Sequence, residues 1–147
     1  MDEIIIFTPI ILGSISTIFC KIDKNAGSNV SFRPKSYVFS IAWTILYLFI
    51  GLSWYYARRD IDNQQLIDVF YTLLNLSLCL WIYVYGCEKN KTNGIYAIVL
   101  SIILAMMCYT IATPIISKML IVPLLGWLFL ATLINIFEVE MSKSNLP

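Results

Sequence analysis

The sequence predicts an all-α membrane protein, a bundle of five transmembrane helices, and three observations support this fold class. Of the 147 residues, 59% are hydrophobic and only 13% are charged, which leaves too little polar surface for a soluble domain of this size. Five apolar runs approach the length of about 20 residues that a helix needs to cross a bilayer. The connections between the runs are short, so we expect residues 1–147 to form a single domain.

The first apolar run, residues 4–20, is short for a membrane crossing. It follows Asp2 and Glu3 instead of the basic start of a signal peptide, so we interpret it as a helix of the mature protein. Gly13 and the hydroxyl residues near it are small, and small residues allow helices to approach closely.

The longest connection, residues 21–35, carries four cations: Lys21, Lys24, Arg33 and Lys35. One interpretation is a lid over one mouth of the bundle. The other is a solvated connector whose positive charges orient the chain in the membrane.

An aromatic stripe marks the second helix, residues 37–57. Phe39, Trp43, Tyr47 and Trp54 recur at intervals that place them on one helix face. The indole N–H of Trp43 and the phenol O–H of Tyr47 need hydrogen-bond partners inside the membrane, so this face is predicted to contact protein or ligand. Helix packing alone is the alternative interpretation.

The third helix, residues 66–87, carries Asn75 about two turns from its start. Its amide is a candidate for ligand binding or for a hydrogen bond between helices. The fourth helix, residues 95–113, presents a ridge of small side chains suited to close packing and compatible with a homodimer, namely Ala97, Ser101, Ala105, Cys108 and Ala112.

The fifth helix, residues 115–137, has Pro123, Trp127, Ala131 and Asn135 at four-residue intervals, which predicts one shared stripe. Pro123 removes a backbone hydrogen bond and can kink the helix. The kink would give a concave wall opposite the second helix. We therefore expect Trp43 and Trp127 to face each other across a gap of ligand size.

Composition also excludes several functions. The net charge of +1 provides no basic surface for nucleic acid. The chain has no histidine, and its four cysteines show neither CxxC nor zinc-ligand spacing. We expect no metal and no cofactor, and we interpret Cys20, Cys79, Cys87 and Cys108 as small buried apolar residues.

The distribution of Lys and Arg predicts the orientation. Seven cations belong to the first loop, the third loop and the C-terminus, whereas Arg58, Arg59 and Lys118 belong to the other side. The positive-inside rule therefore places the first loop and the C-terminus in the cytoplasm and the N-terminus across the membrane. An organellar outer membrane, the endoplasmic reticulum and the plasma membrane all fit these charges.

Two stretches resemble the TspO/MBR family, the translocator proteins or peripheral-type benzodiazepine receptors. Residues 34–51, P-K-S-Y-V-F-S-I-A-W-T-I-L-Y-L-F-I-G, are similar to the family's P-P-x-W-x-F-x-x-x-W-x-x-L-Y-x-x-x-G. Residues 122–135, V-P-L-L-G-W-L-F-L-A-T-L-I-N, are similar to Y-P-Y-x-x-W-x-x-F-A-x-x-L-N. The two matches are long, free of gaps and in the same order as in the family.

The resemblance implies a pocket between the helices, under the first loop, for a porphyrin or a sterol-like molecule. Trp43 and Trp127 match the two tryptophans that handle porphyrin in this family. The other matched positions are Pro34, Tyr47, Ala131 and Asn135. Phe39 completes the aromatic face that we expect to line the pocket.

The chain departs from the family pattern at several positions. Lys35 replaces the second proline, and Leu124 replaces a tyrosine on the pocket side. The family's N-x-x-W motif on the third helix can be aligned in two ways. If Asn75 matches the asparagine, Leu78 stands at the tryptophan position. If Trp81 matches the tryptophan, Leu78 stands at the asparagine position. After Asn135 the chain reads I-F-E-V-E, without the tyrosine and arginine of animal members, which disfavours steroid import.

These residues lead to one main functional prediction and two alternatives. The main prediction is a membrane receptor or carrier for an apolar, aromatic, anionic ligand, with the lipid bilayer as its surroundings. One alternative is an enzyme that degrades porphyrin by light- or oxygen-dependent chemistry at Trp43 and Trp127. The other is a structural or partner-binding membrane protein without a ligand.

Overall fold

A computed structural model describes residues 3–59 and 61–145 as an all-helical bundle. Four of its five main helices are long and apolar enough to cross a membrane, and the first is a shorter apolar helix. The fold class predicted from the sequence is therefore confirmed. In chain order the helices are α1 (Glu3–Phe19), α2 (Ser36–Ala57), the short 3-10 helix η1 (Ile61–Asn63), α3 (Gln64–Ile82), its π-helical continuation η2 (Tyr83–Cys87), α4 (Lys91–Ile111) and α5 (Ile115–Ser144).

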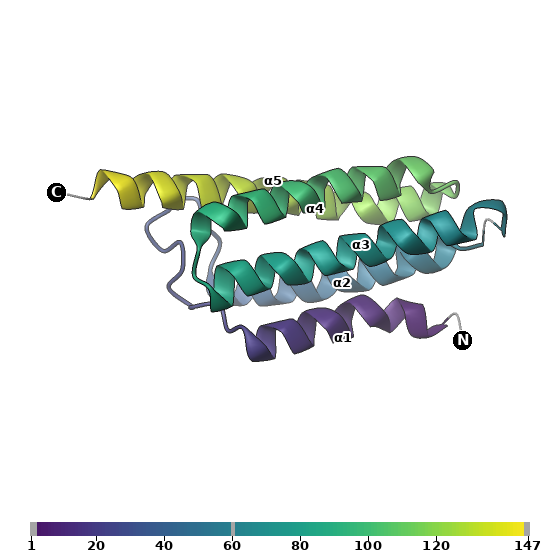
Figure 1. Cartoon of the computed structure of the whole chain (residues 1–147), viewed down its shortest axis with the longest axis horizontal. Coiled ribbons are helices and arrows are strands. Elements are labelled where there is room, and N and C mark those ends of the chain that lie inside the picture. Colours follow the sequence, from purple (N-terminus) through teal and green to yellow (C-terminus); the bar gives the residue numbers. More distant parts are fainter. Residues whose placement is uncertain (1–2, 60, 146–147) are drawn as a thin grey trace.

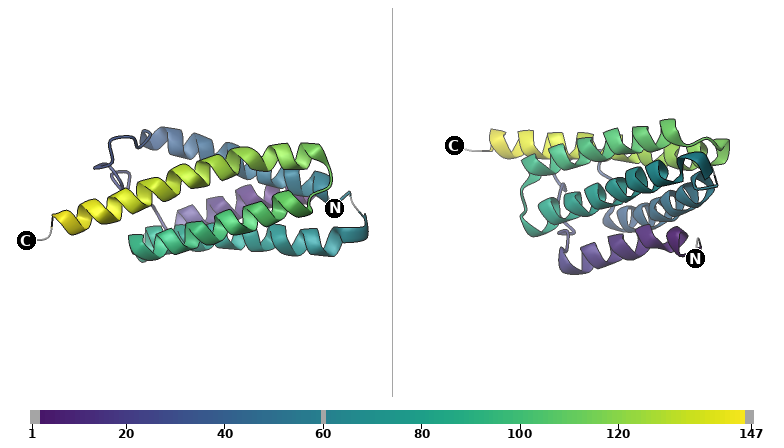
Figure 2. Two further views of the ribbon diagram at one scale, coloured as in Figure 1. Left: turned by 90° about the horizontal axis from the view of Figure 1, so that it is seen from above. Right: turned by 45° about the vertical axis from the view of Figure 1, so that its right-hand side comes forward.

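The five main helices run along one axis in three layers (Figure 1): α1, then α2 with α3, then α4 with α5. Helix α1 contacts α2 and α3, α2 also contacts α5, and α4 lies between α3 and α5. The helices thus close into a ring in the order α1, α2, α5, α4, α3. The first loop and the C-terminus lie at one end of the bundle and the N-terminus lies at the other (Figure 2).

Most helix ends lie within two residues of the sequence prediction, and two differ by four residues or more. Helix α4 begins at Lys91, four residues before the predicted residue 95, because the side chain of Asn90 accepts a hydrogen bond from the backbone N–H of Asn93 and so caps the helix. Helix α5 continues to Ser144 instead of ending at residue 137. An apolar run predicts only the part of a helix that lies in lipid. The helix can continue beyond that part into water.

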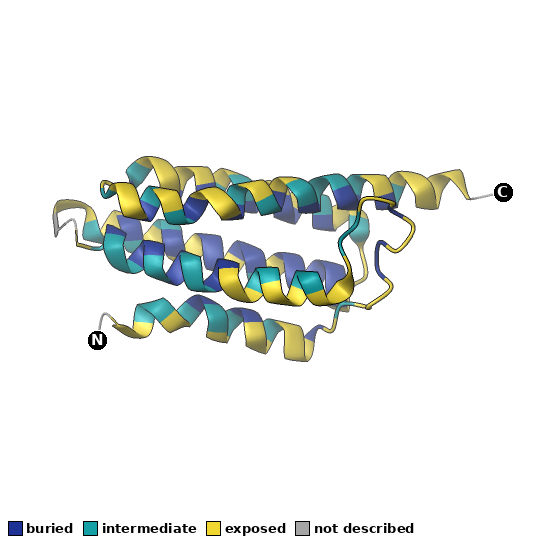
Figure 3. Ribbon diagram, turned by 180° about the vertical axis from the view of Figure 1, so that it is seen from behind, coloured by how far each residue is buried: buried dark blue, intermediate teal, exposed yellow. Residues whose placement is uncertain are grey.

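Many large apolar side chains are exposed on the bundle, and several polar side chains are buried inside it. Figure 3 shows the exposed residues along the outer faces of the helices and the buried ones along the inner faces. Ser53, Tyr71 and Ser117 are fully buried, and the hydroxyl of Ser53 lies 2.6 Å from that of Tyr71 and 2.8 Å from that of Ser117. Polar groups inside and apolar groups outside are the arrangement expected of helices in lipid.

The small residues of α1 and α4 allow close helix packing, as the sequence predicts. They pack against other helices of the same chain and do not lie on the outer surface of the bundle. On α1, Gly13 is buried against the ring of Tyr47. On α4 the predicted ridge is buried inside the chain, and its Ser101 bonds to Ser77 of α3 at 2.9 Å. The ridge is therefore unavailable to a second copy, and the reason for expecting a homodimer at this ridge is wrong.

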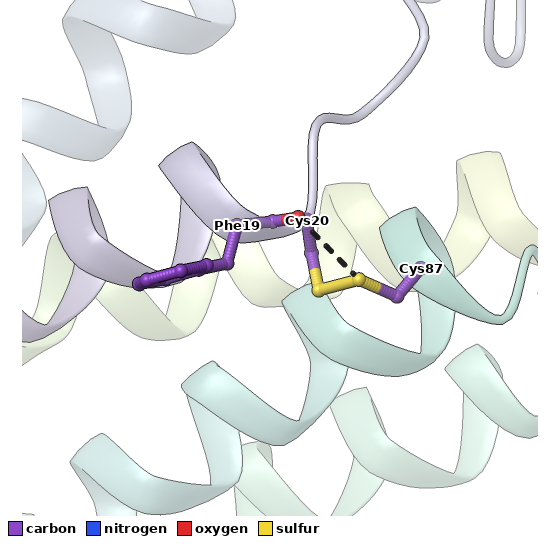
Figure 4. The surroundings of a disulfide bond; sticks show 3 residues. All are labelled: Phe19, Cys20 and Cys87. Carbon is purple, nitrogen blue, oxygen red and sulfur yellow. Dashed lines mark hydrogen bonds between the residues drawn. A yellow bond between two sulfur atoms is a disulfide. The ribbon is translucent and has the colours of Figure 1, made fainter.

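The interpretation of the cysteines as small buried apolar residues is wrong for two of the four, Cys20 and Cys87, and is confirmed for Cys108, which is free and fully buried. Cys20, directly after α1, forms a disulfide with Cys87 at the end of η2 (Figure 4). Cys79 and Cys108 are the free cysteines of the described residues. The two partners are separated by 67 positions in sequence, so the pairing depends on how the helices pack and no local spacing reveals it. The bond joins α1 to α3 beside the first loop.

Candidate functional site

A cavity of about 490 Å³ lies between α1, the first loop, α2, α3 and α5. Its volume falls within the range of about 300–1,000 Å³ that is usual for small-molecule sites. Exposed hydroxyl residues of α1 and α2 line its rim: Ser14, Thr17, Ser36, Ser40 and Thr44. Buried or half-buried side chains of α2, α3 and α5 line the rest of the cavity, so its exposed side lies along α1 and α2.

Four aromatic rings form a continuous stack along the cavity. The ring centroids of Tyr47 and Trp43 are 5.6 Å apart, those of Trp43 and Trp81 are 5.6 Å apart, and those of Trp81 and Tyr85 are 5.3 Å apart. The two tryptophan rings are nearly parallel, with 29° between their planes. All four residues line the cavity, so much of its wall is aromatic.

Six of the residues predicted from the sequence line this cavity. They are Phe39, Trp43, Tyr47, Trp81, Ala131 and Asn135. The aromatic face of α2 thus contributes three of them. Trp54, the fourth member of that stripe, instead stacks on Tyr71 and donates its N–H to Asp68 at 2.8 Å, away from the cavity.

Trp127 does not face Trp43 across a gap. Its ring centroid lies 6.5 Å from that of Trp43 and 5.3 Å from that of Phe39, so the three rings are packed together. Trp127 lines a second, apolar groove of about 310 Å³ on the outer side of α2 and α5, which Pro123 and Gly126 also line. It therefore supports the cavity-lining rings from behind.

The remaining predicted residues do not line the cavity. Leu78 and Leu124 are fully buried in the core. Asn75 donates its amide N–H to the backbone carbonyl of Tyr71 at 2.8 Å, within its own helix. Pro34 is half-buried at the end of the first loop, directly before α2. Of the two third-helix alignments, only the one that uses Trp81 brings a motif residue to the cavity.

The first loop contributes positive charge to the cavity. Lys21, Lys24 and Arg33 all line it. The guanidinium of Arg33 lies 5.2 Å from the ring centroid of Phe39, where a cation interacts favourably with a π face. The loop itself is folded back, because Ser36 donates its hydroxyl to the carbonyl of Lys24 at 3.1 Å. A carboxylate on a bound ligand would therefore meet cations at this end.

The buried carboxylate of Glu138 ties the first loop to the bundle, and the sequence analysis missed this role. One oxygen accepts the backbone N–H of Gly27 at 2.8 Å and the ammonium of Lys91, and the other accepts the hydroxyl of Tyr85 at 2.7 Å. We call these four residues the Glu138 cluster. Gly27 has a φ of +73°, a left-handed conformation that favours glycine.

A signal for this cluster was present in the sequence. Glu138 follows Ala131 and Asn135 at seven and three residues, which is the spacing of one helix face. A carboxylate on the cavity-facing stripe of an apolar helix requires a partner. Its partners lie in the loop, in η2 and in α4, and only the folded structure identifies them.

Within the described ranges, 3–59 and 61–145, no three His, Cys, Asp or Glu side chains lie close enough together to hold a metal ion. The groups that line the cavity are aromatic rings, hydroxyls, one carboxamide, and the first-loop charges, which are three cations and the carboxylate of Asp23. Such a set suits binding of a flat apolar molecule that carries an anionic group.

Comparisons with known proteins give the same family as the sequence motifs. The chain matches the TspO/MBR family over residues 4–138. It is also similar to the tryptophan-rich protein TspO of Archaeoglobus fulgidus, with 27% identity over 106 residues, which cover 71% of this chain and 69% of the relative.

Proposed function

The chain belongs to the TspO/MBR family, and from that premise we propose that it is a membrane receptor or carrier for a flat aromatic ligand, such as a porphyrin. The observation that carries this proposal is the aromatic wall of the 490 Å³ cavity. A macrocycle can lie against Trp43 and Trp81 while its carboxylates reach Arg33, Lys21 or Lys24. A sterol lacks the carboxylates, so the loop cations favour the porphyrin.

The first loop acts as a lid in this proposal. Its cations line the cavity and its backbone is held by Glu138 on α5. The hydroxyl rim between α1 and α2 gives an insoluble ligand a lateral route from the bilayer. Opening the loop would require the Gly27 contact to break, whereas lateral entry would not.

We expect Trp43→Leu to weaken binding of protoporphyrin IX about tenfold, because the substitution removes a stacking face and keeps an apolar side chain. Titration of the purified protein, followed by the porphyrin absorbance, measures this affinity. Trp127→Phe is the matched control, because Trp127 lies outside the cavity lining and should keep nearly the wild-type affinity. A larger loss in Trp127→Phe than in Trp43→Leu would place the ligand in the outer groove and contradict the proposal.

A second function, oxidative degradation of the porphyrin, is favoured by one observation, the ring stack from Trp43 through Trp81 to Tyr85. Tryptophan and tyrosine rings are among the side chains most readily oxidised by one electron. If the protein is such an enzyme, illumination in air will consume bound porphyrin faster than free porphyrin, and Trp43→Leu will remove the difference. Equal rates with and without protein would leave binding as the function.

For orientation we propose that the end bearing the first loop faces the cytoplasm, as the seven cations at this end indicate. The Cys20–Cys87 pair lies at the same end, because Cys20 directly follows α1 and adjoins the first loop. Because the cytosol keeps thiols reduced, we expect this pair to be reduced in cells and to form its disulfide only on oxidation. Acid quenching of cells followed by maleimide labelling and a gel-mobility assay measures the thiols. A pair that is oxidised in unstressed cells would reverse the proposed orientation.

A further inference from the structure

The first part of the first loop, residues 21–26, is held at both of its ends, and we call this segment the strap. At one end Cys20 forms its disulfide with Cys87 (Figure 4). At the other end the backbone N–H of Gly27 donates to the carboxylate of Glu138 at 2.8 Å. Most residues of the strap line the cavity: Lys21, Ile22, Asp23, Lys24 and Ala26.

The end of α1 that leads into the strap is weakly packed. The buried residues of α1 are Pro9 and Gly13, and residues 14–19 are all exposed or half-buried. The next buried residue is Cys20 itself, which is 7% exposed. A helix end with few buried contacts opens at a low free-energy cost, so the covalent bond at Cys20 is the main restraint on this end of the strap.

The disulfide holds this end of α1 against the end of α3. A Cβ atom at Gly86, directly before Cys87, would lie 2.7 Å from the backbone oxygen of Cys20, so the two backbones pack closely beside the bond. The exposed side of the cavity lies along α1 and α2. The bond therefore fixes the wall that α1 contributes to the opening of the cavity.

We propose that the Cys20–Cys87 pair is a redox clasp on the strap, which closes the cavity when it is oxidised and opens it to ligand exchange when it is reduced. The proposal rests on the proposed function, because the strap lines the cavity of the proposed ligand. Reduction frees the α1 end of the strap, while Gly27 stays bound to Glu138. In the cytoplasmic orientation proposed above, oxidising conditions retain the ligand and reducing conditions release it.

The chemistry of the clasp is thiol–disulfide exchange with a small thiol such as glutathione. Cys87 is exposed, whereas Cys20 is buried. A glutathione thiolate attacks Sγ of Cys87, the bond between the two cysteines breaks, and Sγ of Cys20 leaves as a thiolate that takes up a proton. A second glutathione thiolate then attacks the glutathione sulfur of the mixed disulfide, which releases Cys87 as a thiol and forms glutathione disulfide. Oxidation by glutathione disulfide is the reverse of these two steps.

Digestion with endoproteinase Lys-C, which cleaves after lysine, tests the strap without any ligand. Lys21 and Lys24 lie in the strap, and Lys143 in the last turn of α5 is the internal reference. We expect cleavage after the strap lysines to be about tenfold faster in protein reduced with dithiothreitol than in protein oxidised with glutathione disulfide, because local opening precedes cleavage. Cleavage after Lys143 should not change. All fragments are fully reduced before their masses are measured.

Two variants separate the bond from general effects of the reagents. Cys20→Ser should be cleaved at the faster, reduced rate under both conditions. Cys79→Ser is the matched control, because Cys79 is a free cysteine, and it should keep the difference between the two redox states. Equal cleavage of the strap in oxidised and reduced wild-type protein would overturn the clasp.

Release of protoporphyrin IX tests whether the clasp controls the ligand. After dilution of the complex, porphyrin fluorescence should show release about tenfold slower from oxidised than from reduced protein, and the same difference in Cys79→Ser. Equal release rates would overturn the clasp whatever happens to the strap lysines. If protoporphyrin IX binds in neither state and strap cleavage still depends on the redox state, the proposed function fails and the redox restraint on the strap is confirmed.

Discussion

Gly51→Ala is expected to destabilise the bundle by about 3 kcal/mol or more, because it prevents α1 from packing against α2. A Cβ at Gly51 would lie 2.0 Å from the backbone oxygen of Ile6 and 2.7 Å from its carbonyl carbon. The clash is with backbone, which cannot rotate away as a side chain can. The whole of α1 must therefore shift, and one side of the cavity shifts with it.

Thermal unfolding in detergent measures this loss, and Gly126→Ala provides the control, because a Cβ at Gly126 meets nothing within 4 Å. Both changes add one methyl group to an apolar helix, but only Gly51 faces another backbone. Gly126→Ala should be neutral or slightly stabilising, because alanine has the higher helix propensity. Equal midpoints for the two variants would mean that α1 does not pack on α2 at Gly51.

Glu138→Ala is expected to cost about 3 kcal/mol and to release the first loop, because it leaves buried donors without an acceptor. The groups affected are the N–H of Gly27, the hydroxyl of Tyr85 and the ammonium of Lys91. We expect the loop to become sensitive to protease, whereas the loop of the wild-type protein resists cleavage. Limited proteolysis and thermal unfolding together measure the two effects.

Glu140→Ala provides the comparison for this substitution. Glu140 lies two residues further along α5 and is exposed, so its removal should change the unfolding midpoint little. Glu138→Gln should fall between the two, because the amide oxygen can still accept one bond but the charge that pairs with Lys91 is lost. A loop equally resistant in Glu138→Ala and wild type would show that the Glu138 cluster does not hold it.

The fold could be predicted from the sequence because lipid imposes a simple requirement. A helix is the structure that satisfies its own backbone hydrogen bonds, so each apolar run long enough to cross the bilayer becomes one. Helix ends outside the apolar run follow other rules. The cap at Asn90 and the extension of α5 to Ser144 depend on local hydrogen bonds and on water, which hydropathy does not measure.

The sequence predicted that four residues of α5 share one stripe, but only two of them line the cavity. Helix geometry explains this error. Residues four positions apart are offset by about 40° around a helix, so the offset from Pro123 to Asn135 is about 120°. Asn135 and Ala131 consequently line the cavity, whereas Pro123 and Trp127 line the outer groove. Residues repeated every four positions therefore form a stripe that winds around the helix. After three repeats the stripe has moved onto a different helix face.

The parts of the site that the sequence did not reveal depend on pairs of residues distant in the chain. Glu138 binds the backbone of Gly27, which is 111 residues away, and Cys20 pairs with Cys87 across 67 residues. Local spacing carries information about one helix at a time, so contacts among three helices and a loop require the packed structure.

The measurement that tests the account most directly is an experimental structure of the protein with protoporphyrin IX bound. The account predicts the macrocycle inside the cavity, in contact with the ring of Trp43, with its propionates toward Arg33 and the first loop. A macrocycle bound in the outer groove against Trp127 and Pro123, with the cavity empty, would contradict it.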